Sequence, residues 1–199
     1  MNLYASKSAI NARLDPVVGR LARTRVSPDL ITLSAVPVAL LGGGALLASP
    51  TYALTLLAVP VLAGIRLLLN LLDGNLARST GRIHPRGELY NELGDRFADT
   101  AFLAPVAFLP GASAPIVLLG LIAGLLASYT GVVVRAAGGP RLYRGILSKP
   151  GRMALLAAFS LWAFAAGPET PWAIFGPVLL IGGVLTLAER LFVAVRTLE

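Results

Sequence analysis

The sequence predicts an all-α, polytopic membrane protein: six transmembrane helices preceded by an N-terminal amphipathic juxtamembrane helix. Of the 199 residues, 56% are apolar and only 14% are charged, whereas soluble domains average about a quarter charged residues. The mean hydropathy of +0.75 agrees with this class, as does the alternation of basic and neutral connections along the chain. We expect one domain over 1–199, with 1–27 as an interfacial segment and 28–199 as a six-helix bundle.

The first 25 residues predict a basic amphipathic helix. Apolar side chains recur there at intervals of three and four, and between them stand Lys7, Arg13, Arg20, Arg23 and Arg25. This pattern is typical of a helix lying on a membrane surface, although docking on the protein's own cytosolic face fits it equally well. The segment has neither the apolar core nor the cleavage site of a signal peptide.

From Leu30 onward the apolar runs are nearly continuous, and turn residues separate them. Because a span needs about 20 apolar residues, we expect spans at about 30–48, 52–72, 87–109, 114–134, 153–167 and 172–194. The third of these runs is polar for a membrane span.

Basic residues test this count independently. They lie in the N-terminal segment, after the second span, after the fourth span and near the C-terminus, whereas the other three connections contain none. This is the positive-inside pattern for an even number of spans. It predicts that both termini lie in the cytoplasm. The compact size and the absence of a targeting extension favour a bacterial inner (plasma) membrane.

Composition also restricts the chemistry. The chain has no cysteine and one histidine, His84, which excludes thiolate chemistry and makes a histidine-rich zinc site improbable. Seventeen basic against ten acidic residues give a net charge of +7, which in a membrane protein indicates orientation and anionic lipid or phosphate partners rather than nucleic acid. Glycines at 42–44 and 182–183 favour close helix packing or a homodimer.

Ionisable groups inside membrane spans are costly and mark functional sites. Here they gather at the end of the second span and the start of the third. Each set repeats at intervals of three and four and so shares one helix face: Asn70, Asp73, Gly74 and Ala77, then Glu88, Asn91, Asp95 and Asp99. Oxygen ligands without histidine or cysteine suit Mg²⁺ or Mn²⁺, and Arg78 at the helix end suits a phosphate. A diphosphate-bearing substrate is therefore expected near the cytoplasmic face.

The same residues resemble the signature of the CDP-alcohol phosphotransferases, D-x2-D-G-x2-A-R-x8-G-x3-D-x3-D. The chain has every spacing of that signature, with Asn70 and Asn91 in place of the first and third aspartates. Residues 26–33 resemble the family's Pro-Asn-x-Ile/Leu-Thr segment before the first span, and Lys149 with Arg152 resembles its basic element on the acceptor side. The resemblance extends over essentially the whole chain.

This resemblance implies a metal-dependent transferase of phospholipid biosynthesis. It would move a phosphatidyl group from a CDP-linked lipid, such as CDP-diacylglycerol, to the hydroxyl of a polar alcohol and release CMP. Asp95 would be the general base, one or two Mg²⁺ or Mn²⁺ ions would bind Asn70, Asp73, Asn91 and Asp95, and the nucleotide would bind Asp73, Gly74, Ala77, Arg78 and Gly87. The sequence does not identify the acceptor alcohol.

The two asparagines remove two negative charges from the expected metal site. Either one ion is lost or weakly held, or neighbouring acids restore the charge, for which Glu88, Glu92 and Asp99 are candidates. Arg66 and Arg96 are expected to be ion-pair partners of these acids. A pocket for an acceptor phosphate is expected among Arg135, Arg141, Arg144, Lys149 and Arg152.

Three other functions stay open at this point. A prenyl-diphosphate transferase also uses aspartate and asparagine around Mg²⁺ but usually needs a second aspartate-rich motif. A transporter would spread polar residues over two related halves. A catalytically impaired relative would bind the CDP-linked lipid without turnover.

Overall fold

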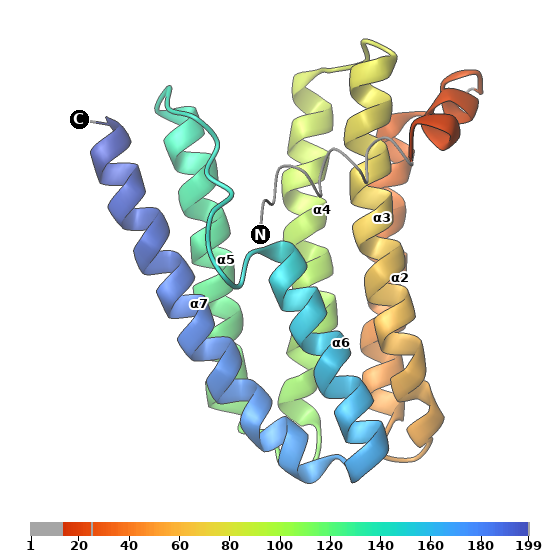
Figure 1. The fold of residues 1–199 in the computed structure, drawn as a ribbon, viewed down its shortest axis with the longest axis vertical. Coiled ribbons are helices and arrows are strands. Elements are labelled where there is room, and N and C mark those ends of the chain that lie inside the picture. The colour runs from red at the N-terminus through yellow and green to blue at the C-terminus, as the bar shows by residue number, and fades with distance from the viewer. Residues whose placement is uncertain (1–13, 25, 199) are drawn as a thin grey trace.

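The computed structural model describes residues 14–24 and 26–198, which form helices and connections but no strand. Six long helices run up and down side by side (Figure 1). They are α2 (Pro28–Ala48), α3 (Ala58–Ser79), α4 (Pro85–Leu103), α5 (Ala114–Ala136), α6 (Lys149–Ala166) and α7 (Glu169–Leu198), with short 3₁₀ helices η1 (Ala53–Leu57) and η2 (Ala104–Phe108).

All six helices lie where the sequence predicts spans, but most of their boundaries differ by a few residues. The third expected span, 87–109, begins at Pro85 and divides into α4 and η2; the fifth begins at Lys149 rather than at 153; and the second and sixth extend to Ser79 and Leu198. Proline near the first turn explains the early starts of α4 and α6, since its fixed φ suits that position and its missing N–H is not needed there.

Within the described part of the chain, four helical segments are long and apolar enough to cross a membrane: α2, η1 with α3, α5 and α7. The helix α4 is too polar for that description because its acids and Arg96 interrupt the apolar residues. Basic residues at its start and a length of 18 residues set α6 apart as well.

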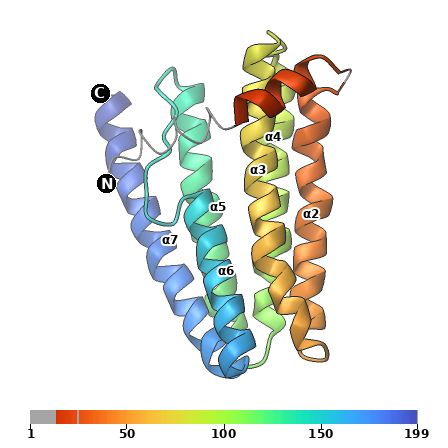
Figure 2. The same ribbon diagram turned by 45° about the vertical axis from the view of Figure 1, so that its right-hand side comes forward.

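Helix α2 packs between α3 and α4, while α5 packs along α7, and α6 joins the two groups through α3 and α7. A core of buried apolar residues runs through this arrangement and includes Phe102 of α4 and Phe175 of α7. The connection between α5 and α6 runs back down beside α5 before α6 begins (Figures 1 and 2). Its Gly145 has a φ of +120°, and a Cβ there would lie 2.2 Å from Thr186 of α7.

Residues 14–22 are helical and lie across the end of the bundle next to α2 and α3 (Figure 2). Val18 is buried in a cluster with Ile31 of α2 and with Leu72 and Leu76 of α3. The apolar side chains of these residues therefore contact the protein itself, one of the two arrangements that the sequence left open. Lys7, Arg13 and Arg25 lie outside the described residues.

Four of the five glycines that favoured a homodimer pack inside the chain, whereas Gly44 is exposed and a Cβ there would meet nothing within 4 Å. A Cβ at Gly42 would lie 2.0 Å from Phe102, and one at Gly43 would lie 2.2 Å from the carbonyl oxygen of Ala101. Gly182 and Gly183 likewise face Leu147 and Ala123. The homodimer stays a prediction, without support from these four buried or partly buried glycines.

Candidate functional site

Polar side chains from α3, α4 and α6 meet between the helices. The Asn70 amide donates to Asp95 Oδ1 at 3.0 Å and to Asn91 Oδ1 at 3.4 Å. The Lys149 ammonium donates to Asn70 Oδ1 at 2.6 Å and also to Asp95 Oδ2. We call Asn70, Asn91, Asp95 and Lys149 the polar cluster. It confirms that α3 and α4 turn these oxygens toward each other, and it adds a cation from a third helix.

Asp73 lies on the same face of α3 and is 6% exposed. Its Oδ2 accepts a hydrogen bond from Thr32 of α2 at 2.7 Å, and its Oδ1 accepts one from the Gly74 amide at 2.5 Å. Helix α2 therefore orients this carboxylate. The sequence did not predict the contact, because no spacing within one helix relates Thr32 to Asp73.

A cavity of about 470 Å³ lies between the end of α3, the start of α4 and the connection after α5. All five residues predicted to bind a nucleotide line it: Asp73, Gly74, Ala77, Arg78 and Gly87. Asn91, Thr32, Arg135 and Arg141 line it too, together with Arg82 and Tyr143. Six of the eight motif residues thus surround one space, with small residues where α3 and α4 border it; Asn70 and Asp95 do not line it.

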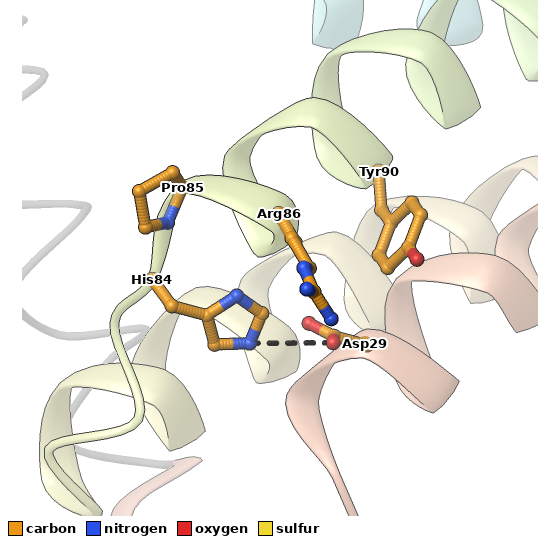
Figure 3. A pocket seen from close by; sticks show the side chains of 5 residues that line it. All are labelled: Asp29, His84, Pro85, Arg86 and Tyr90. Atoms are coloured by element: carbon orange, nitrogen blue, oxygen red, sulfur yellow. Dashed lines mark ion pairs between the residues drawn. The ribbon is translucent and has the colours of Figure 1, made fainter.

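Asp29 of α2 contacts His84, the residue just before α4, beside this cavity. His84 caps α4, its Nδ1 accepting a hydrogen bond from the Gly87 amide at 2.9 Å. Its Nε2 lies 3.3 Å from Asp29 Oδ2. The side chains of Arg86 and Tyr90 also point toward Asp29 (Figure 3). These residues and Pro85 line a second, outer hollow of about 550 Å³.

Among the described residues, none of the three candidate auxiliary acids forms an ion pair with the polar cluster. Glu88 is exposed and pairs with Arg135 at 3.2 Å, and Glu92 pairs with Arg96 at 2.5 Å and with Arg141. Asp99 is 1% exposed and lies between Arg66, at 2.5 Å, and Arg152. Each acid therefore already has a basic partner, as was expected for Arg66 and Arg96.

The five basic residues expected to form an acceptor pocket do not gather in one place. Arg135 and Arg141 line the cavity, Lys149 belongs to the polar cluster, and Arg152 is buried on Asp99. The Arg144 side chain is exposed, while its carbonyl oxygen accepts a hydrogen bond from Arg190 of α7 at 2.7 Å. Of the five, Arg135 and Arg141 are placed to meet a substrate in the cavity.

Known proteins resemble this chain over most of its length. No protein-family model matches it. The inner membrane protein YnbA of Escherichia coli is 34% identical over 86% of this chain and 84% of its own length. The archaetidylinositol phosphate synthase of Aeropyrum pernix is 31% identical over 94% of each chain. The chain belongs to the CDP-alcohol phosphotransferase family.

Solved structures agree with this family fold. The phosphatidylinositol phosphate synthase of Mycobacterium tuberculosis with CDP-DAG bound has a TM-score of 0.72 and 22% identity, over 90% of this chain and 92% of that one. The same enzyme in complex with manganese and citrate also has a TM-score of 0.72, with 20% identity, over 90% and 87%. The sequence relatives thus show the family, and these solved structures show that the fold is shared.

The residues offer oxygen ligands for the divalent cation that the family implies. Within 14–24 and 26–198, no three His, Cys, Asp or Glu side chains are grouped so as to hold a metal ion. Two carboxylates, of Asp73 and Asp95, and two amide oxygens, of Asn70 and Asn91, are present instead. This donor set fits a hard cation such as Mg²⁺ or Mn²⁺.

Proposed function

We propose that the chain transfers a phosphatidyl group from a CDP-linked lipid, such as CDP-diacylglycerol, to the hydroxyl of a phosphorylated polyol, with release of CMP. As a CDP-alcohol phosphotransferase it is a metal-dependent membrane transferase of phospholipid biosynthesis. The observation that carries the proposal is the single cavity lined by all five nucleotide-side motif residues and by Asn91. Its relatives include an archaetidylinositol phosphate synthase and a phosphatidylinositol phosphate synthase, whose names support this class of acceptor.

The cavity walls suit the nucleotide end of the donor. A Cβ at Gly74 would approach only the Arg78 guanidinium, at 3.4 Å or more, so the α3 side of the wall is open there. A Cβ at Gly87 would lie 3.1 Å from Asp29 Oδ1. Glycine therefore leaves the cavity wall without a side chain at the start of α4. Arg78 supplies a positive charge for a phosphate oxygen. Arg135 and Arg141, also on the cavity wall, suit the phosphate of the acceptor.

Asp95 is the proposed general base; it lies one turn of α4 beyond Asn91, which lines the cavity, and does not line the cavity itself. Its carboxylate would accept the proton of the acceptor hydroxyl as that oxygen bonds to the lipid-side phosphorus, while the bond from this phosphorus to the CMP oxygen breaks. Thr32 orients Asp73 through the 2.7 Å hydrogen bond. Asp73 and Asn91 would hold a divalent cation at the cavity, and this ion supplies positive charge that stabilises the diphosphate and the departing CMP.

We also propose that the chain is one domain with six spans, both termini in the cytoplasm and the site at the cytoplasmic face of an inner membrane. The connection after α3 and the C-terminus lie at the same end of the bundle (Figure 1), and both regions are basic. A homologue is named an inner membrane protein. The helix that includes residues 14–22 is proposed to lie at the same surface.

The test is an assay of CMP release by purified protein in mixed micelles containing CDP-diacylglycerol and Mn²⁺ or Mg²⁺. Inositol phosphate, glycerol phosphate and serine are compared as acceptors. We expect CMP release with a phosphorylated polyol, its loss in Asp95→Asn, and measurable binding of the CDP-linked lipid by that variant. Unchanged turnover in Asp95→Asn would remove this residue as the base. Binding without CMP release from any acceptor would favour the impaired relative.

A further inference from the structure

The metal-ligand positions of the motif divide into two halves in the structure. Asp73 and Asn91 line the cavity, where a diphosphate would enter. Asn70 and Asp95 do not line it; they lie next to Lys149, whose ammonium contacts an oxygen of each. Asn70 and Asp95 therefore already accept hydrogen bonds from a cation, whereas Asp73 accepts its hydrogen bonds from Thr32 and the Gly74 amide.

The amide of Asn70 makes this arrangement possible. It donates to Asp95 Oδ1 at 3.0 Å while its oxygen accepts from Lys149 at 2.6 Å. An aspartate at position 70 would instead place two carboxylates at that distance, and these would repel each other unless a further cation lay between them. Asparagine at this position thus removes the need for a metal ion between α3 and α4.

The charges lead to the same conclusion. The charges of four aspartates and two divalent ions sum to zero. In this chain, the charges of Asp73, Asp95 and the Lys149 ammonium sum to −1 before any metal ion is counted. One divalent ion brings this sum to +1, and two bring it to +3. Neighbouring acids do not offset the excess, because Glu88, Glu92 and Asp99 each pair with at least one arginine.

We infer that the Lys149 ammonium takes the place of one divalent cation, so that this transferase binds a single divalent ion, at Asp73 and Asn91. The inference rests on the proposed function and specifies its metal site. It also gives Lys149 a position different from the acceptor-phosphate pocket expected from the sequence. The two negative charges lost at positions 70 and 91 offset the loss of one divalent ion, and the Lys149 ammonium supplies the positive charge beside Asn70 and Asp95.

The test counts bound metal without measuring activity. Purified protein in detergent is titrated with MnCl₂, and free Mn²⁺ is followed by its electron paramagnetic resonance signal. We expect one ion per chain for the wild type and for Lys149→Arg, which keeps the charge. We expect two ions for the triple variant Asn70→Asp, Asn91→Asp, Lys149→Met. Lys149→Met alone should bind its ion about tenfold more tightly, because a nearby positive charge is gone.

Arg144→Met is the matched control, since it removes one positive charge from the connection just before α6, where the side chain is exposed. It should bind one ion with wild-type affinity. Two ions per wild-type chain would overturn the inference and leave the proposed function intact. If the wild type bound no ion and EDTA did not inhibit CMP release, both the inference and the metal dependence would be overturned. The number of ions bound by the wild type tests the inference even if a variant does not fold.

Discussion

Replacing Asp99 by asparagine should destabilise the protein more than any change in its exposed ion pairs. Asp99 is 1% exposed and is the acid between Arg66 and Arg152, which are 1% and 2% exposed. Arg66 has few other bonds: Nη2 also donates to the Asp95 carbonyl at 3.1 Å, while Nε and Nη1 lack a hydrogen-bond partner among the described residues. Asparagine keeps the shape of the side chain but leaves two buried guanidinium groups without a counter-charge.

Removing one partner of a buried ion pair costs about 3–5 kcal/mol, and the loss for Asp99→Asn should lie toward the upper end because one acid serves two arginines. The measurement is reversible unfolding in mixed micelles of increasing SDS content, followed by circular dichroism. Glu88→Gln is the control: its pair with Arg135 is exposed, and such pairs contribute about 0–1 kcal/mol. A loss below about 1 kcal/mol for Asp99→Asn would refute the role given to this network.

Three further outcomes test the cavity. Asp73→Ala should lose Mn²⁺ binding and binding of the CDP-linked lipid together, measured by metal titration and by equilibrium binding; retained metal-dependent CMP release would contradict its assignment as a ligand. Thr32→Val should raise the KM for the CDP-linked lipid several-fold while costing about 1 kcal/mol of stability, because the 2.7 Å bond that orients Asp73 is lost; an unchanged KM would show that Asp73 does not need this bond. Gly74→Leu should weaken lipid binding at least about tenfold by filling the cavity, with an unchanged circular dichroism spectrum; wild-type affinity would place the donor elsewhere.

The helices could be predicted because their signal is local. Apolar runs of span length and the proline and glycine residues between them are properties of neighbouring residues, and all six helices lie where these patterns indicated. The spacing of Asn70 and Asp73, and of Asn91 and Asp95, likewise placed the motif residues on the facing sides of α3 and α4. Exact starts were harder to predict, because the first turn of α6 carries Lys149 and Arg152, which interrupt an apolar run.

Contacts between distant helices could not be predicted. Which acid faces which base depends on how α6 is set against α3 and α4, and this is fixed by the connection that ends at Ser148. The sequence grouped Lys149 and Arg152 with three loop arginines because all five are basic and close together along the chain. In the structure both residues lie in one turn of α6, where Lys149 donates to Asp95 and Arg152 donates to Asp99.

The short α6 bears on how two unlike substrates meet. At 1.5 Å per residue its 18 residues span about 27 Å, against about 45 Å for the 30 residues of α7. Since α6 starts below the upper ends of α5 and α7 (Figure 1), its first turn lies beneath the level that those helices reach. The water-soluble alcohol proposed as acceptor would therefore have to pass below the ends of α5 and α7 to reach Lys149 and Asp95.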